Sequence, residues 1–340
     1  MPALGNRVTT TTQDKYLPFL VDSVLNSNVF ATRQLGAAKS WSGSQIRFPV
    51  KVSKNSTGTS FSGFDTFSTN ATNNRITLDY NPTAYQITVA LPLDELTANQ
   101  TDEKVLDLAS VEIATAAQDM ADDIGTLFYA DGTGNSSKDF LGLAAIVDDG
   151  SGVATIGGQS RSTYSTLQST VTASGGTLTL ALMQTLYSNV SSGSQKPTLG
   201  LCPEAVYDFY QQLLNPQERI PKDVAMVKRG LVGGTGFSSL FFMGFPILAD
   251  EKATAQTLFF VNEDFIDFYG RPMATTEAVK YKSVDIRGND YSSVLGLGFS
   301  WSGWIKPSNQ AAVVGHIYLF GNMVTSNPKR HGRLTGITAV

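Results

Sequence analysis

Residues 44–54 read SQIRFPVKVSK, and residues 74–91 read NRITLDYNPTAYQITVAL. In both segments apolar residues alternate with polar ones, a pattern that predicts β-strands with one apolar face. The Asn81-Pro82 pair predicts a turn that divides the second segment into two strands. Between the two segments the chain is rich in Ser, Thr, Asn and Gly. We therefore expect a hairpin that carries a long polar loop.

A hairpin over residues 44–91 would be too long to pack fully against its own body. An arm of roughly 20 residues spans about 65 Å at about 3.3 Å per residue. A compact chain of 340 residues has a radius of gyration of about 20 Å. An isolated hairpin is only marginally stable in water, and its aromatic side chains would be exposed apolar surface. We expect this segment to contact another copy of the chain or another protein, through Phe48, Phe61, Phe64, Phe67, Tyr80 and Tyr85.

The strongest helical pattern lies in residues 101–129, where apolar residues recur every three or four positions. Thr101 can cap this helix, and Asp102 and Glu103 lie in its first turn, where the helix dipole favours acidic residues. Roughly 28 residues at about 1.5 Å each predict a rod of about 42 Å. The apolar positions are Leu106, Ala109, Ile113, Ala116, Met120, Ile124 and Leu127.

The rest of the chain predicts shorter elements. Helices are expected over residues 179–190 and directly after Pro203. A short helix within residues 15–35 would belong to an arm that is too small to fold alone. From residue 237 onward most segments alternate like strands. Strands and helices are segregated along the chain, so the predicted class is α+β.

Composition argues against several classes of protein. Charged residues make up 16% of the chain and the net charge is −4, whereas a nucleic-acid-binding face is basic. The single cysteine, Cys202, excludes an internal disulfide framework and is expected to be a buried apolar residue. The N-terminus lacks the apolar core of a signal peptide, and no apolar run is long enough to cross a bilayer. We expect a soluble protein that is made in the cytoplasm.

The glycine-rich stretch YADGTGNSSKDFLGL, residues 129–143, has the composition of a metal or phosphate loop. A calcium loop that begins at Asp131 needs glycine at its sixth position and glutamate at its twelfth, but these positions hold Ser136 and Gly142. A phosphate loop precedes its helix, whereas these glycines follow one. We predict a corner at the end of the long helix, where glycine gives the backbone its freedom.

No catalytic constellation emerges from the remaining residues. The two histidines, His316 and His331, lie near the C-terminal end, and no Cys, His and Asp cluster has metal-ligand spacing. No G-x-S-x-G elbow is present. Neighbouring carboxylates such as Asp148 and Asp149 are expected to be solvated surface. We therefore expect no catalytic residue, no metal, no cofactor and no enzymatic activity.

The order of these segments resembles the major capsid proteins of tailed double-stranded DNA bacteriophages, whose fold is shared with encapsulins. LVDSVLNSNVFATRQLGAAKSWSGSQIRFPV resembles their N-terminal arm and first strand. Residues 101–129 resemble their spine helix, and YADGTGNSSKDFLGLAAI resembles the turn after it. GLCPEAVYDFYQQLLNPQER, FFMGFPILADE and TLFFVNEDFIDFYGR are similar to their axial domain, and GNMVTSNPKRHGRLTGI is similar to their C-terminal return strand. The resemblance extends over nearly the whole chain.

The resemblance implies a phage major capsid fold with five parts. These are an N-terminal arm (1–43), an extended β-hairpin loop (44–93), a peripheral domain (94–198) with the spine helix, an axial domain (199–300) and return strands (301–340). It implies a structural protein of the virion that self-assembles into hexamers and pentamers of an icosahedral head around double-stranded DNA. Its partners would be itself and packaged DNA without sequence specificity, with scaffold, portal and decoration proteins as further candidates. No membrane is implied.

Two features bear on how assembly would proceed. The chain begins at Met1 and reaches its first strand near residue 44, so we expect any scaffold to be a separate protein. Some relatives crosslink through a lysine of the extended loop. Lys51 and Lys54 lie there, but no Asn and Glu partners are identifiable, so non-covalent assembly is expected.

Two alternative functions remain open at this point. One is an encapsulin-like compartment that encloses a cargo enzyme rather than a genome. The other belongs to a different class, either a β-rich surface adhesin or a β-rich glycosidase. The absence of a secretion signal argues against the adhesin, and a pair of carboxylates roughly 5–10 Å apart would support the glycosidase.

Overall fold

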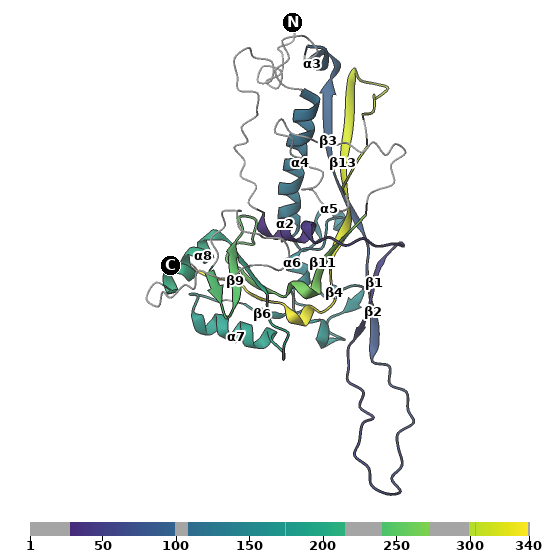
Figure 1. Ribbon diagram of the computed structural model, residues 1–340, viewed down its shortest axis with the longest axis vertical. Coiled ribbons are helices and arrows are strands. Elements are labelled where there is room, and N and C mark those ends of the chain that lie inside the picture. Colours follow the sequence, from purple (N-terminus) through teal and green to yellow (C-terminus); the bar gives the residue numbers. More distant parts are fainter. Residues whose placement is uncertain are drawn as a thin grey trace.

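The computed structural model describes residues 28–98, 108–173, 175–214, 240–271, 299–302 and 304–338. A body of mixed helix and sheet lies at the centre, a ribbon of two long strands with a helix beside it extends from one side, and a hairpin extends from the other (Figure 1). Predictions for the arm before residue 28 and for residues 101–107 lie outside the described residues.

The extended ribbon is formed by two antiparallel strands far apart in sequence. β3 (Thr83–Pro92) pairs with β13 (Ala312–Thr325) from Thr83 opposite Gly321 to Pro92 opposite Ala312. The opposite edge of β13 pairs with β11 (Ile266–Gly270) and β12 (Phe299–Trp301). A four-stranded sheet results, and the short helix α3 (Leu93–Ala98) follows β3 at the end of the ribbon.

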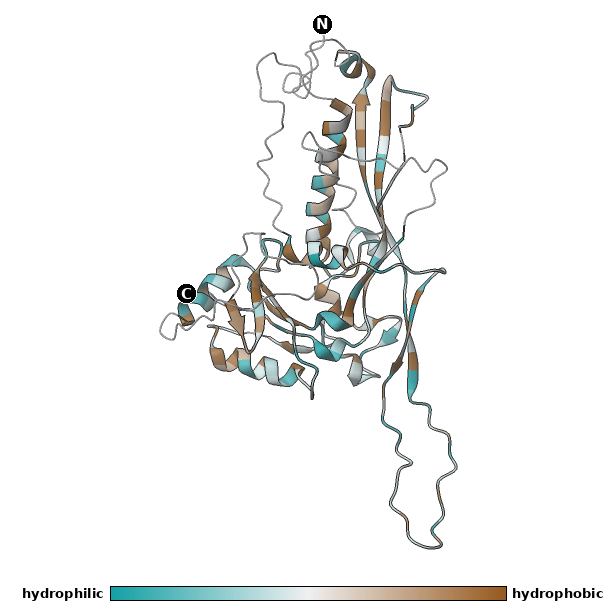
Figure 2. Cartoon of the chain, viewed as in Figure 1, coloured by the Kyte–Doolittle hydropathy of each residue, from teal (hydrophilic) through white to brown (hydrophobic). Residues whose placement is uncertain are grey.

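Helix α4 (Leu108–Leu127) packs along this ribbon because one of its faces is apolar (Figures 1 and 2). Ile113, Met120 and Ile124 are buried, and they share a cluster with Val89 and Leu319 of the two strands. The described part of the predicted long helix is therefore confirmed, and its last helical residue lies two positions before the predicted end. Helix α2 (Val29–Gly36) also packs into this cluster.

The glycine-rich stretch after α4 forms the predicted corner. The chain turns back so closely that the Leu143 N–H donates to the Phe128 carbonyl at 2.7 Å. A Cβ atom on Gly142 would collide with the backbone of Leu127 and Ala130, so only glycine fits there. A left-handed turn, α5 (Gly134–Ser137), precedes Gly142, and the short helix α6 (Leu143–Ile146) follows it.

The body is built on a six-stranded mixed sheet. Its spatial order is β6, β14, β10, β7, β9 and β8. Helices α7 (Leu180–Val190) and α8 (Glu204–Leu214), both predicted, pack on it in a second apolar cluster. The strands are β6 (Thr170–Thr172), β7 (Leu199–Cys202), β8 (Leu240–Phe242), β9 (Phe245–Ala249), β10 (Leu258–Val261) and β14 (Gly332–Leu334).

The strands of this sheet come from three of the parts that the resemblance implied, the peripheral domain, the axial domain and the return strands. β6 and α7 were expected in the peripheral part and β14 among the return strands, yet all three pack with β7–β10. β11 was expected in the axial part, yet it pairs with β13. The physical reason is that β14 is inserted between β6 and β10 by hydrogen bonds, and alternation of residues does not specify such a partner.

The hairpin consists of β1 (Ile46–Lys51) and β2 (Arg75–Tyr80), which pair antiparallel from Ile46 opposite Tyr80 to Lys51 opposite Arg75. The chain then enters β3 in a different sheet, so the observed hairpin ends at Tyr80 and not near residue 93. Small connecting elements complete the body: β4 (Thr155–Ile156), β5 (Gln159–Ser160), η1 (Ser165–Leu167), η3 (Glu263–Phe265) and η4 (Pro328–Arg330).

Candidate assembly surface

The base of the hairpin is anchored to its own chain. Leu78 and Tyr80 of β2 point inward and are buried with Ile156 and Val324. The Tyr80 hydroxyl donates to the Thr325 carbonyl at 2.7 Å, and burial raises the pKa of Tyr80 well above its usual range. Tyr80 is only 1% exposed, so this residue, which was expected at an inter-subunit interface, packs against its own body.

Phe48 and Tyr85 also contact the chain itself. The Phe48 ring is half-buried and packs edge-on against Tyr80 at 6.3 Å and Tyr269 at 5.6 Å between centroids. Tyr85 lies on β3, outside the hairpin, and its hydroxyl donates to Asp123 of α4 at 2.7 Å. Burial, together with the hydrogen bond to the Asp123 carboxylate, raises the pKa of Tyr85 to about 12. These two residues were expected to contact another chain, and here they help to hold the hairpin and the ribbon on the body.

A clamp that the sequence did not reveal secures the segment leading into the hairpin. The Arg271 guanidinium lies over the adjacent rings of Trp41 and Phe320, 5.0 and 5.2 Å from their centroids, and the two rings contact each other with 5.7 Å between centroids. It also donates to the Gly43 carbonyl at 3.2 Å. Cation–π contacts of this kind contribute about 0.5–2 kcal/mol each. The sequence does not indicate that Trp41 and Arg271 are in contact, because they lie far apart in the chain and meet only in the folded structure.

The loop beyond the hairpin carries the exposed aromatic residues. Phe61, Phe64 and Phe67 are 66%, 106% and 60% exposed, as predicted for these three positions. Figures 1 and 2 show the loop extending away from the body, with its few apolar positions set in a largely polar stretch. Strand pairing stops near the Val52 N–H, which donates to the Asn74 carbonyl at 3.0 Å. This aromatic tip is therefore apolar surface without a partner in the described part of the chain.

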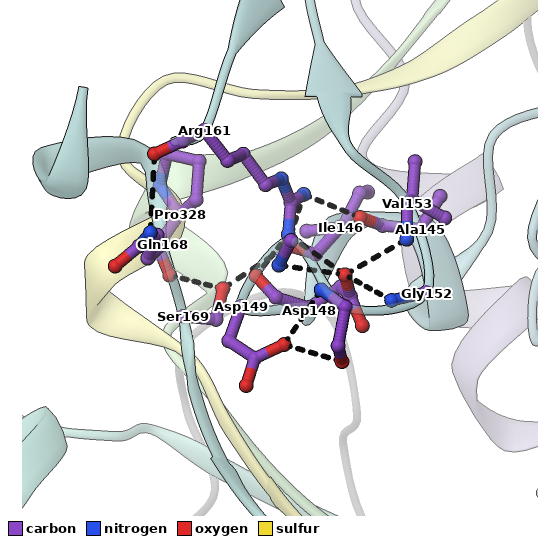
Figure 3. Close-up of polar contacts among 12 residues, drawn as sticks. Ala145, Ile146, Asp148, Asp149, Gly152, Val153, Arg161, Gln168, Ser169 and Pro328 are labelled. Atoms are coloured by element: carbon purple, nitrogen blue, oxygen red, sulfur yellow. Dashed lines mark hydrogen bonds and ion pairs between the residues drawn. The ribbon is translucent and has the colours of Figure 1, made fainter. Parts of the chain in front are cut away.

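A buried arginine stabilises the body beneath the ribbon (Figure 3). Arg161 is fully buried, and its guanidinium donates to the carbonyls of Ala145 (2.5 Å), Ile146 (3.3 Å) and Asp148. These carbonyls follow or end α6 and have no partner within that short helix. Arg161 therefore closes the C-terminal end of α6 as a side-chain cap.

Asp148 is the acidic partner in this network. It is fully buried, whereas the sequence predicted a solvated carboxylate pair with Asp149. One carboxylate oxygen accepts from the N–H groups of Gly150, Gly152 and Val153 at 2.8, 3.2 and 2.9 Å. The other accepts from Arg333 at 2.6 Å. A buried carboxylate with this many donors organises a turn and serves as a structural group.

His331 is also structural. It is completely buried, its Nδ1 accepts from the Asn262 N–H at 3.2 Å, and its Nε2 lies 3.3 Å from the Thr325 hydroxyl. Burial lowers the pKa of His331 to about 3, so the ring is neutral at physiological pH. His316 lies on the ribbon, 3.0 Å from the Thr88 hydroxyl. The structure does not bring the two histidines together.

The described residues hold no group of three or more His, Cys, Asp or Glu side chains arranged to bind a metal ion. Cys202 is buried, and burial raises the pKa of its thiol well above the usual range. Across the described ranges, no helix combines the length and the apolarity that a bilayer crossing requires.

Comparison with known proteins identifies solved structures that have a similar fold. No family model matches the sequence, and no curated protein matches it. The capsid of cyanophage A-1(L) matches with a TM-score of 0.71 and 15% identity, over 95% of this chain and 96% of that chain. The SrpI encapsulin of Synechococcus elongatus matches with a TM-score of 0.61 and 11% identity, over 95% and 92%.

A third match is the capsid of Myoviridae phage XM1, with a TM-score of 0.56 and 13% identity, over 95% of this chain and 96% of that chain. These matches extend over nearly the full length of both partners, so they include the ribbon, the hairpin and the body together. The chain therefore has the major capsid fold that bacteriophage shells share with encapsulins.

Proposed function

We propose that this protein is a structural shell subunit that self-assembles into the hexamers and pentamers of an icosahedral phage head around double-stranded DNA. The observation that carries the proposal is the match to phage capsids along 95% of the chain, with a projecting loop whose aromatic tip has no described partner. Exposed aromatic rings mark an interaction surface, and a subunit that binds its neighbour gains buried apolar area from such a loop.

The mechanism of assembly is geometric. Each copy extends its loop over the next copy, a heterologous contact that closes into a ring when the rotation between copies is right. Burial of a phenylalanine side chain contributes about 1.5–3 kcal/mol, and every subunit in the ring contributes its own aromatic tip. Many modest contacts of this kind hold a ring without any covalent bond.

The other partners follow from the same role. A net charge of −4 suits a shell that encloses DNA without binding it tightly or by sequence. Scaffold, portal and decoration proteins are further candidate partners. The protein would be made in the host cytoplasm and located in the virion.

An encapsulin-like compartment is the second candidate, and the match to the SrpI encapsulin supports it. A shell of either kind needs the same ribbon, body and loop, so the fold alone does not separate them. The matches to shell proteins favour a structural role over the adhesin and glycosidase alternatives.

The test is expression of the chain alone and with proteins encoded beside it, followed by electron microscopy and analysis of particle contents. Closed icosahedral particles containing nuclease-protected DNA support the phage head. Particles that enclose a single co-purified protein support the compartment. Monomers under every assembly condition contradict both.

A further inference from the structure

The aromatic tip, residues 61–67, has a defined local structure although strand pairing ends far before it. The Ser62 N–H donates to the Asp65 carboxylate at 2.8 Å, and the Asp65 N–H donates to the Ser62 carbonyl at 3.4 Å. Gly63 lies between them with φ of +56°, a left-handed conformation that favours glycine. These bonds close a tight turn at the far end of the loop.

The phenylalanines of this turn divide into two kinds. Phe61 and Phe67 pack against each other edge-on, with 5.1 Å between ring centroids, and so join the two strands of chain that flank the turn. Phe64 lies at the apex between them and has no ring partner among the described residues. Its exposed fraction of 106% shows that its own chain shields none of it. Phe61 and Phe67 therefore stabilise the turn, and the Phe64 ring is exposed to solvent.

We propose that residues 61–67 form a preorganised knob in which Phe64 is the anchor that enters an apolar pocket of a second copy of this chain. Phe61 and Phe67 position the anchor. This inference rests on the proposed function and goes beyond it, because it assigns different roles to the three phenylalanines and to the turn that carries them.

A second copy is the partner that the surroundings of the knob favour. Residues 52–74 contain one lysine, Lys54, and one acid, Asp65, so the loop has no net charge. A nucleic acid would select a basic loop, whereas a protein pocket accepts a neutral, hydroxyl-rich segment around an aromatic anchor. The hairpin base is already packed on its own body, and the knob points away from that body (Figure 1).

Preorganisation explains why the turn is built in the absence of its partner. Ordering a loop during binding costs free energy that a preformed turn does not spend. Interfaces concentrate their affinity in a few central aromatic anchors. A ring held at the apex of a closed turn combines both properties.

The test compares loop variants of the full chain by sedimentation velocity under conditions in which the wild type assembles. Phe64→Ala is expected to raise the subunit concentration needed for assembly at least about thirtyfold, and Phe64→Leu is expected to restore part of that loss. Thr69→Ala, an exposed change in the same loop, serves as the matched control and should assemble like the wild type. Thermal unfolding of the unassembled subunits should be unchanged in all three.

Two further variants test the turn separately from the anchor. Gly63→Ala introduces no clash, since nothing lies within 4 Å of the added Cβ, but it strains the left-handed backbone. Asp65→Ala removes the acceptor of the Ser62 N–H. Each should weaken assembly about fivefold, and Asp65→Ala should speed hydrogen exchange of the Ser62 amide in the free subunit.

The outcomes separate the two proposals. If Phe64→Ala assembles as well as the wild type, Phe64 is not the anchor, and the proposed shell function is unaffected. Full assembly of both turn variants, with Phe64→Ala defective, overturns preorganisation. A wild-type chain that forms no particle, alone or with its scaffold, overturns the shell function and the knob with it.

Discussion

At the scale of single residues, three buried polar side chains of the body have structural roles. Arg161 caps α6, Asp148 organises a turn, and neutral His331 links Asn262, the residue before η3, to Thr325 of β13. Each would be costly to leave unpaired. Their chemistry therefore affects stability and its dependence on pH.

Acidification should destabilise the unassembled subunit through His331. Its pKa falls from 6.5 to about 3 on folding because the folded ring is buried. Between these values the unfolded chain binds a proton that the folded chain does not. The free energy of unfolding should therefore fall by up to about 1.4 kcal/mol for each pH unit below 6.5. Urea unfolding at pH 7 and pH 5 measures this, and His331→Gln should lose that part of the pH dependence. An equal slope in both proteins would contradict the assignment.

The turn at residues 135–137 should be stabilised by glycine. Asn135, Ser136 and Ser137 have φ of 54°, 61° and 61°, a left-handed run that costs residues with a Cβ about 1 kcal/mol each. Ser136→Gly should therefore raise the free energy of unfolding by about 0.5–1 kcal/mol after the added entropy of the unfolded chain. Ser162→Gly, another exposed serine but without a positive φ, is the control and should give no gain. Thermal unfolding of both variants measures the difference, and an equal stability of the two would contradict the prediction.

At the scale of elements, side-chain hydrogen bonds at both ends hold the short helix α2 on the body. The Asp250 carboxylate accepts from the Phe30 N–H and the Tyr129 hydroxyl, both at 3.0 Å. At the other end of the helix, Arg33 makes two hydrogen bonds to Glu263 at 2.9 and 2.7 Å. The exposed fractions of these two side chains are 6% and 8%. A buried bidentate pair of this kind specifies where the helix docks.

Breaking this pair should cost more than removing it. Arg33→Met removes the guanidinium that pairs with the buried Glu263 carboxylate, and should lower the free energy of unfolding by about 3–5 kcal/mol. The double variant Arg33→Met with Glu263→Met should lose much less, since both charges of the pair are removed together. Urea unfolding of the two single variants and the double variant gives the coupling energy. Additive losses would show that the two side chains do not depend on each other.

At the scale of the whole molecule, the ribbon and the hairpin extend from opposite sides of one body (Figure 1). The body has its own apolar clusters, and the hairpin base has another. The loop between residues 53 and 73 adds nothing to these clusters, so the proposed assembly contact lies outside the part of the chain that forms the core.

Shortening the loop should therefore abolish assembly without unfolding the subunit. Replacement of residues 54–73 by two glycines keeps β1, β2 and the bond between Val52 and Asn74. We expect an unchanged thermal midpoint and no particles by sedimentation velocity. A matched variant keeps the loop length but replaces Phe61, Phe64 and Phe67 by serine, and it should behave in the same way. Particles formed by either variant would exclude the loop as the assembly element.

The sequence by itself determined the periodic elements and the exposed loop. The α4 apolar stripe, the strands β1 and β2, and helices α7 and α8 follow from local spacing, because an element buries the face that its own residues make apolar. The exposure of Phe61, Phe64 and Phe67 follows from a polar stretch too long to pack. The corner after α4 was also readable, since a glycine-rich stretch after a helix marks a turn, but the close approach at Gly142 was not.

Only the tertiary structure decided which strands pair and which polar residues are buried. β14 joins the six-stranded sheet, Tyr80 and Asp148 lie in the interior, and Arg271 reaches Trp41. The physical reason is that alternation specifies an apolar face but not its partner, and that a charged side chain is buried only where distant segments supply its hydrogen bonds. Those segments meet only after the chain has folded.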